Sequence, residues 1–187
     1  GLTVVNTNPL YTARELKHQL TDSGATAIVV LENFAHVLEK VLDATPVRHV
    51  ILTSVGDMLQ WPRRGIVNLA VRYLKRSVPR YHLPHAARWR EAMQRDAKQG
   101  FSPTAISGSD LALLQYTGGT TGVAKGAMLT HRNLVANLQQ VAALWHSAIE
   151  PGREIVITAL PLYHIFSLTC NCLLFVHHGG LNVLIAN

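Results

Sequence analysis

Residues 116–126 read YTGGTTGVAKG. These eleven positions hold four glycines, three threonines and one lysine. Glycine lets the backbone come close to a ligand without a Cβ in the way, and successive free N–H groups form a concave nest for an anion. The threonine hydroxyls add donors or metal contacts, and Lys125 adds a mobile positive charge. The stretch therefore predicts a loop between two elements of an α/β fold that holds a polyphosphate.

Two other interpretations of this stretch are weaker. The P-loop of nucleotide triphosphatases reads G-x-x-x-x-G-K-[ST] and opens a helix. Here Lys125 follows Ala124 and precedes Gly126, and residues 127–130 (AMLT) resemble a strand. A kinase or triphosphatase is therefore disfavoured. A plain turn between strands needs only about two to four such residues, so the longer set that ends in lysine favours phosphate binding.

Length and composition indicate a globular protein. The chain has 187 residues, of which 48% are hydrophobic and 15% charged, enough for a domain with a core of buried parallel strands. Both ends lie in extended or apolar runs, so we expect a piece of a larger protein, and no secretory leader is visible. The apolar stretch at 165–176 is too short to cross a bilayer. Two cysteines, Cys170 and Cys172, cannot complete a four-ligand zinc site.

The order of predicted elements gives the fold class. Strands are expected at 3–5, 27–31 and 49–53, with helices at 12–23 and 33–42 between them, and this alternation is typical of an α/β protein with parallel-sheet crossover units. Residues 56–108 form a basic, partly helical insert, with helices at 66–78 and 85–98. Residues 109–187 carry strands at 111–117, 127–130 and 154–160, a helix at 131–145, an apolar helix to His177 and a last strand after Gly180.

The basic insert suggests a charged surface. Eight Lys and Arg residues and no Asp or Glu lie between Arg63 and Arg90, and the net charge of the chain is +6. The expected helix carries its apolar residues along one side. Either this is a solvated basic face packed on its own domain, or it contacts an anionic membrane surface. The residues that would make that contact are Arg63, Arg64, Arg72, Lys75, Arg76 and Arg80. Nucleic acid is disfavoured, because no zinc finger, helix-turn-helix or RNP motif accompanies the charge.

A second motif lies at 160–166, which read LPLYHIF. It follows a predicted buried strand, and open α/β sheets place their ligand crevices at the carboxyl ends of strands. Pro161 ends the strand, so Tyr163 and His164 are expected to face that crevice. A single histidine at a strand end is, by itself, more often structural than catalytic.

Taken together, these motifs resemble those of the acyl-adenylate-forming enzymes. YTGGTTGVAKG is similar to their phosphate-binding signature, with Gly118 in place of the usual serine and Ala124 in place of the usual proline. LPLYHIF resembles their L-P-x-x-H motif in order and spacing. The segments VVNTNPLYTARELKHQL and GAMLTHRNLVANL extend the resemblance along the chain to bacterial long-chain fatty-acid–CoA ligases, and specifically to part of their large N-terminal AMP-binding domain.

The resemblance implies a two-step reaction. A fatty-acid carboxylate attacks the α-phosphate of ATP to give acyl-AMP and pyrophosphate, and the thiol of coenzyme A then displaces AMP. His164 and Lys125 are the implied catalytic residues, with His164 on the side of the acyl carboxylate. The implied ATP-phosphate residues are Tyr116, Thr117, Gly118, Gly119, Thr120, Thr121, Gly122, Lys125 and Gly126, with Thr120 also near Mg²⁺. The implied acyl pocket comprises Tyr163, His164, Phe166, Ser167 and Leu168.

The chain lacks other motifs of that family. The Y-G-x-T-E and T-G-D segments and the late catalytic lysine do not occur in it, so we expect no catalysis by this chain alone. The resemblance implies a cytoplasmic enzyme, peripheral on the inner membrane, and leaves the oligomeric state open. Two alternatives remain: a non-catalytic nucleotide-, phosphate- or membrane-binding module, or an acyl-adenylating ligase for another carboxylate.

Overall fold

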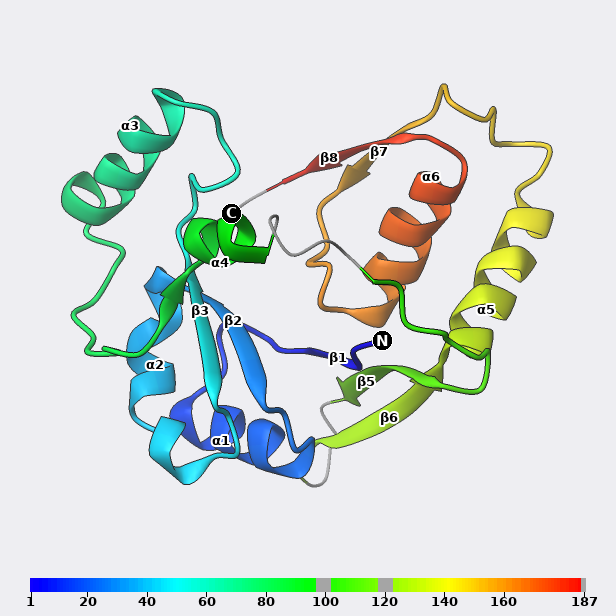
Figure 1. Cartoon of the computed structure of the whole chain (residues 1–187). Coiled ribbons are helices and arrows are strands. Elements are labelled where there is room, and N and C mark those ends of the chain that lie inside the picture. Colours follow the sequence, from blue (N-terminus) through cyan, green and yellow to red (C-terminus); the bar gives the residue numbers. More distant parts are fainter. Residues whose placement is uncertain (97–101, 118–122, 186–187) are drawn as a thin grey trace. The chain divides into compact units, whose positions relative to one another are not determined.

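The computed structural model describes residues 1–96, 102–117 and 123–185 of the chain (Figure 1). The chain divides into two compact units. Unit 1 combines Gly1–Asn8 with Thr104–Asn187, and unit 2 is Pro9–Pro103. Both units contain parallel strands and helices, so the predicted α/β class is confirmed.

The main sheet of unit 1 has the order β1-β5-β6. Strand β1 (Val4–Asn6) pairs in parallel with β5 (Leu111–Thr117), and β5 pairs antiparallel with β6 (Lys125–Thr130). The prediction of a strand at 111–117 is confirmed, and β6 begins two residues earlier than expected. Strand β5 is buried on most of its length, as expected for a central strand with a near-continuous apolar sequence.

The rest of unit 1 is helical, with a second pair of strands. Thr130 and Asn133 form a capping box at the start of α5 (His131–Leu144). The Thr130 hydroxyl accepts from the backbone N–H of Asn133, and the Asn133 side chain accepts from the backbone N–H of Thr130. Strands β7 (Ile155–Thr158) and β8 (Leu181–Leu184) pair in parallel. The helix between them begins as a π-helix, η4 (Ser167–Leu173), and continues as α6 (Leu174–His177). Strand β7 was expected to be buried, but Ile155 and Ile157 are exposed.

Unit 2 is built on the parallel strands β2 (Ala27–Leu31), β3 (His49–Thr53) and β4 (Ala87–Arg88). Helix α1 (Ala13–Asp22), within the helix expected at 12–23, begins with a capping box of Thr12 and Glu15. Helix α1 and helix α2 (Ala35–Glu39) pack with β3 around one apolar core. The core consists of Leu16, Leu20, Ala35, Leu38, Val41, Val50 and Leu52.

Three helices of unit 2 differ from the sequence-based expectation. The helix expected at 33–42 is broken into η1 (Glu32–Phe34), α2 and η2 (Leu42–Ala44), and none of these pieces has a side-chain cap. The helix expected at 66–78 begins at Arg63 as α3 (Arg63–Leu69) and continues as the π-helix η3 (Ala70–Leu74). The helix expected from 85 begins later as α4 (Trp89–Asp96), because Ala87 and Arg88 pair with β3 instead.

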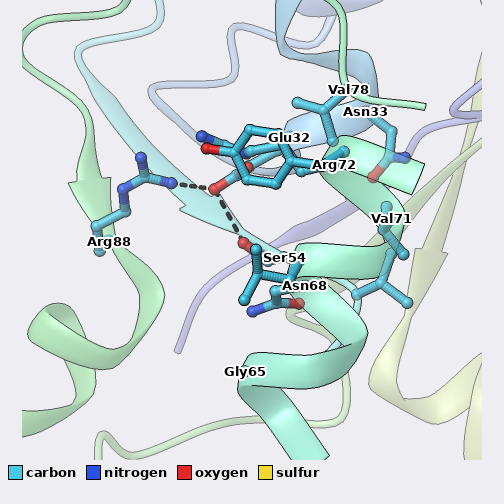
Figure 2. Close-up of a pocket in the computed structure, with 12 residues that line it drawn as sticks. Glu32, Asn33, Ser54, Gly65, Asn68, Val71, Arg72, Val78 and Arg88 are labelled. Carbon is cyan, nitrogen blue, oxygen red and sulfur yellow. Dashed lines mark hydrogen bonds and ion pairs between the residues drawn. The ribbon is translucent and has the colours of Figure 1, made fainter. Parts of the chain in front are cut away.

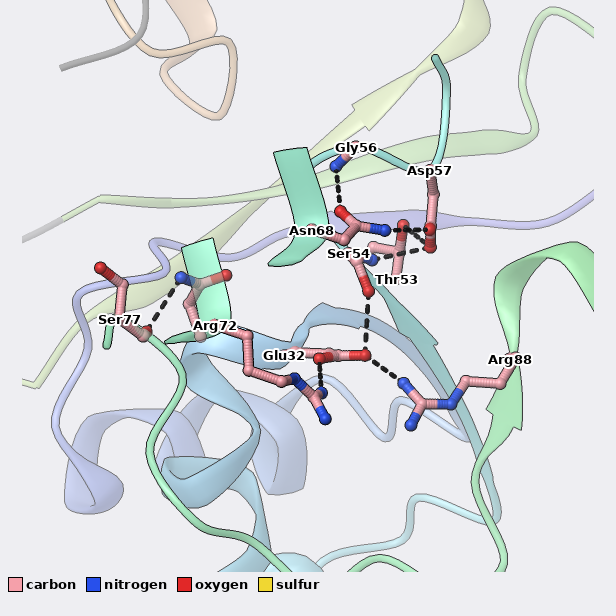
Figure 3. Close-up of polar contacts among 10 residues, drawn as sticks. Glu32, Thr53, Ser54, Gly56, Asp57, Asn68, Arg72, Ser77 and Arg88 are labelled. Carbon is pink, nitrogen blue, oxygen red and sulfur yellow. Dashed lines mark hydrogen bonds and ion pairs between the residues drawn. The ribbon is translucent and has the colours of Figure 1, made fainter. Parts of the chain in front are cut away.

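A buried carboxylate connects the strands of unit 2 to η3 (Figure 3). Glu32 directly follows β2, Ser54 directly follows β3, and Arg88 ends β4. The Glu32 carboxylate accepts hydrogen bonds from Ser54 Oγ at 2.9 Å and from the guanidinium groups of Arg88 and Arg72. Parallel strands end at the same edge of their sheet, so one carboxylate can join all three strand ends with Arg72 of η3.

These contacts set the ionisation of Glu32. Burial opposes the charged form, but the hydrogen bonds from Arg72 and Ser54 and the charges of Arg72 and Arg88 outweigh it and lower the pKa of Glu32. A carboxyl group whose pKa is lower in the folded state stabilises that state above its unfolded pKa, and this contribution is lost as pH falls through the folded pKa. The stabilisation by Glu32 is therefore complete at neutral pH and declines below the ordinary glutamate value of about 4.3.

We predict that Glu32→Gln lowers the free energy of unfolding at pH 7 by roughly 2 kcal/mol, because it removes charge-assisted hydrogen bonds. The loss relative to the wild type should shrink as the pH is lowered below about 4. Denaturant unfolding at several pH values measures both effects. Glu39→Gln, at an exposed position of α2, is the matched control and should change stability little. An equal loss at pH 7 and pH 3 would contradict the assignment.

Candidate functional site

The two ends of the glycine-rich stretch lie opposite each other on β5 and β6. In the antiparallel register Tyr116 pairs with Gly126, and Thr117 pairs with Lys125. Both Thr117 and Lys125 are exposed. Strand pairing therefore closes the loop at its base and places a hydroxyl and a positive charge side by side where the loop leaves the sheet.

The centre of the predicted phosphate site lies outside the described residues. This applies to Gly118, Gly119, Thr120, Thr121 and Gly122. For these residues the phosphate-binding role remains a prediction from sequence. The described part of the site is its rim, formed by Tyr116, Thr117, Lys125 and Gly126.

Gly126 has a packing role that the sequence did not indicate. A Cβ at this position would lie 3.0 Å from both Cε2 and Cζ of the Tyr116 ring. Tyr116 is buried, so its ring covers the backbone of Gly126 across the strand pair. A larger residue at 126 would collide with a ring that has little room to move.

The second motif forms a tight turn that leads into η4. The backbone N–H of His164 donates to the carbonyl of Pro161 at 3.1 Å, and the N–H of Leu168 donates to the carbonyl of His164 at 2.9 Å. The His164 side chain is exposed, and its ring centroid lies 4.7 Å from that of the half-buried Tyr163. His164 is thus presented at the surface by a turn whose backbone is fixed on both sides.

The other residues of the predicted acyl pocket have different environments. Phe166 is exposed and Leu168 is half-buried. Ser167 is fully buried, and its hydroxyl donates to the carbonyl of Leu160 at 2.8 Å. In the described residues Ser167 therefore closes the turn by bonding its first residue, a structural contact that leaves no surface for an acyl chain.

One residue outside both motifs connects them. Gln115 of β5 is buried, and its Nε2 donates to the carbonyl of Tyr163 at 3.1 Å. This bond, between residues 48 positions apart in the chain, brings the LPLYHIF segment against the strand that enters the phosphate loop. The sequence carried a signal for it, because a glutamine within the apolar strand LALLQYT needs a hydrogen-bond partner when buried.

The described residues include no group of three or more His, Cys, Asp or Glu side chains that could hold a metal ion. The implied contact between Mg²⁺ and Thr120 lies outside these residues.

The basic insert presents its apolar side to solvent. Ile66, Leu69, Tyr73 and Leu74, which the sequence aligned along one side of a helix, are all exposed on α3 and η3. Arg63, Lys75, Arg76 and Arg80 are exposed as well, and Arg64 is half-buried. Arg72 differs, since it is bound to Glu32. In the described ranges no helix combines the length and apolarity needed to span a membrane.

A cavity of about 280 Å³ lies between the Glu32 cluster and the α3–η3 helix (Figure 2). Its wall combines Glu32, Arg72 and Arg88 with Asn33, Asn68, Val71 and Val78. The Glu32 carboxylate is bonded to both guanidinium groups on this wall, so the three charged side chains bind one another and leave one net positive charge. We interpret the cavity as the space around this ion cluster.

We predict that Gly126→Ala destabilises unit 1 by roughly 1–3 kcal/mol through the collision with the Tyr116 ring. In a Tyr116→Leu background the same change should cost less, because the ring is gone. Gly65→Ala is the matched control: no atom lies within 4 Å of its added Cβ, and alanine in helix α3 should stabilise by about 0.5–1 kcal/mol. Chemical denaturation measures all three, and equal costs of Gly126→Ala in both backgrounds would refute the contact.

Comparison with known proteins identifies the family. The family model described as AMP-binding enzyme matches residues 1–187. A long-chain-fatty-acid–CoA ligase from Salmonella typhimurium is 59% identical over 187 residues, which are 100% of this chain and 33% of that protein. A ligase of the same name from Bacillus subtilis is 34% identical over 170 residues, or 90% of this chain and 30% of its own length.

Solved structures support the same conclusion. A long-chain-fatty-acid–CoA ligase from Archaeoglobus fulgidus matches with a TM-score of 0.67 and 29% identity, over 99% of this chain and 31% of that one. A luciferase from Phrixothrix hirtus matches with a TM-score of 0.72 at 18% identity, over 98% of this chain and 31% of its own, and shows a shared fold. The chain spans about one third of the length of its curated relatives. It belongs to the AMP-binding enzyme family.

Proposed function

We propose that this chain is part of the N-terminal domain of a long-chain fatty-acid–CoA ligase, and that it supplies the pyrophosphate side of the acyl-adenylating site. The observation that carries this proposal is the hydrogen bond between Gln115 and Tyr163, which brings the His164 segment to the strand that opens the phosphate loop. Similarity over the whole chain to fatty-acid–CoA ligases supports it.

In the proposed first step, a fatty-acid carboxylate attacks the α-phosphate of ATP and pyrophosphate leaves. Two anions must approach each other, so catalysis depends on oriented donors and positive charge. We assign the β- and γ-phosphates to backbone N–H groups of the loop and to the hydroxyls of Thr117, Thr120 and Thr121. Mg²⁺ bound to ATP would neutralise part of the phosphate charge. Coenzyme A enters only in the second step, when its thiol displaces AMP.

Lys125 and His164 have separate roles in this proposal. Lys125 is exposed at the base of the loop and forms no ion pair with any described residue, so its ammonium group is available to the departing pyrophosphate. His164 is exposed at the turn that Gln115 fixes, and we assign it to the acyl carboxylate. Phe166 and Leu168 follow His164 on the same turn and could line the entrance for the acyl chain, whereas Ser167 holds the turn closed.

We predict that Lys125→Ala and Thr120→Ala, made in the whole protein that carries this chain, each reduce fatty-acid-dependent ATP–pyrophosphate exchange by about tenfold or more. Lys17→Ala is the control, because Lys17 is an exposed lysine of α1 in unit 2. Its exchange rate should equal that of the wild type. Unchanged exchange in the Lys125 and Thr120 variants would remove these residues from the site.

We further propose that the whole protein acts in the cytoplasm and contacts the inner membrane peripherally through α3 and η3. An amphipathic helix lies on an anionic bilayer when apolar side chains face the lipid and basic ones flank them. Here the exposed Ile66, Leu69, Tyr73 and Leu74 are flanked by Arg63, Lys75, Arg76 and Arg80. Because Arg72 is bound to Glu32, the contact depends on the other basic residues.

We predict that Leu74→Glu weakens flotation of the whole protein with phosphatidylglycerol vesicles by several-fold, because it adds a negative charge to the inserted face. Leu144→Glu on α5 is the matched control, since the exposed fractions of Leu74 and Leu144 are 83% and 78%. Binding should also fall as salt is raised. If both variants float like the wild type at low salt, or the wild type does not float at all, α3 and η3 are not a membrane contact.

A further inference from the structure

Gln115 stands between the two motifs without belonging to either. It precedes Tyr116 on β5, and its side chain is only 7% exposed. Burying an amide is costly unless it forms hydrogen bonds, and those bonds can hold a neighbouring segment in a way that an apolar side chain cannot. The neighbouring buried residues of β5, Ala112 and Leu113, are apolar, so the amide at 115 stands out within the strand.

The amide of Gln115 holds one particular peptide unit. Its Nε2 donates to the carbonyl of Tyr163 at 3.1 Å. The N–H on the other side of the same peptide bond belongs to His164 and donates to the carbonyl of Pro161 at 3.1 Å. Because a peptide unit is planar, bonds to both of its polar groups fix the plane from which the His164 Cα and side chain extend.

The second contact of the amide is to its own strand. Gln115 Nε2 also lies 3.4 Å from the carbonyl of Tyr116, the residue whose ring covers Gly126 at the base of the phosphate loop. Two further bonds lie within the turn: Ser167 bonds Leu160, and Leu168 bonds His164. A shift of the turn relative to β5 would therefore stretch the Gln115 bond and leave the internal bonds intact.

We propose that Gln115 is a positioning residue that sets the distance and orientation between the base of the phosphate loop, at Thr117 and Lys125, and His164. This inference rests on the proposed acyl-adenylation. In that reaction the loop holds one reactant and the His164 segment orients the other, so the rate depends on their mutual placement. A displacement of about 1 Å between reacting groups costs up to about 100-fold in rate, even when each reactant binds normally.

The amide nitrogen of Gln115, Nε2, forms the bond that positions the turn, whereas its amide oxygen, Oε1, does not take part. In the described residues Oε1 of Gln115 is buried and has no hydrogen-bond partner. Variants can therefore separate the two atoms. Methionine keeps the length and volume of the side chain without a donor, and asparagine keeps the amide but withdraws it by one methylene group from the Tyr163 carbonyl.

The test measures ATP–pyrophosphate exchange in the whole protein with a long-chain fatty acid. We expect Gln115→Met and Gln115→Asn to lower kcat by about 10- to 100-fold, with the KM values for ATP and fatty acid within about twofold of the wild type. Gln19→Met is the matched control, because Gln19 is also a buried glutamine, 1% exposed, but lies on α1 in unit 2. It should alter thermal stability without altering kcat per folded molecule.

A second readout does not depend on activity. Amide hydrogen exchange of residues 160–166 should accelerate in both Gln115 variants and stay unchanged in Gln19→Met, because only the former release the Tyr163–His164 peptide. Wild-type kcat in either Gln115 variant, or a rise in KM alone, would overturn the positioning role. If the wild type shows no fatty-acid-dependent ATP–pyrophosphate exchange, the proposed function fails. Unchanged amide hydrogen exchange at 160–166 in the Gln115 variants would separately refute the role of Gln115 in holding this segment.

Discussion

The antiparallel pairing of β5 with β6 is the interaction on which the site depends. It places Thr117 opposite Lys125 and Tyr116 opposite Gly126, so both ends of the glycine-rich loop start from a fixed base. β5 also pairs with β1 and holds the LPLYHIF turn through Gln115. The strand β5 thus carries the base of the loop at its end, joins β1 and β6 as the central strand of the sheet, and holds the second motif through the Gln115 side chain. A change in its register by one residue would disturb all three.

In both units a buried polar side chain connects a strand to a segment that is distant in sequence. In each, a buried polar side chain at or near the carboxyl end of a parallel strand bonds a segment from another part of the chain. Gln115 does this in unit 1 and Glu32 in unit 2. Glu32 is charged and Gln115 is neutral, and this difference determines whether their contacts depend on pH. The Glu32 cluster depends on pH because its carboxylate must stay ionised, whereas the amide of Gln115 is neutral at every pH at which the protein is folded.

Much of the fold could be predicted from sequence. The bounds of β2, β3 and β5 and the starts of α1 and α5 are local signals, and the structure has them at, or within one residue of, the expected positions. The errors include the helices of the basic insert, the helix at 33–42 and the burial of β7. At 87–88 strand pairing outweighed helical periodicity. The sequence indicated that a buried Gln115 needs a partner, but it did not identify that partner. The partners of Glu32, Gln115 and Ser167 depend on residues distant in sequence or on the geometry of a turn, which periodicity does not describe.

The position of β1 has a consequence for how the chain folds. Thr3 donates to the carbonyl of Leu111, 108 residues away, while all of unit 2 lies between these partners. Closing so long a segment costs conformational entropy before any contact is gained, and distant pairings slow folding. If unit 2 forms first through its local βα contacts, it shortens the effective connection between β1 and β5. Unit 2 would then act during synthesis as a folded spacer that brings an early strand within reach of a late one.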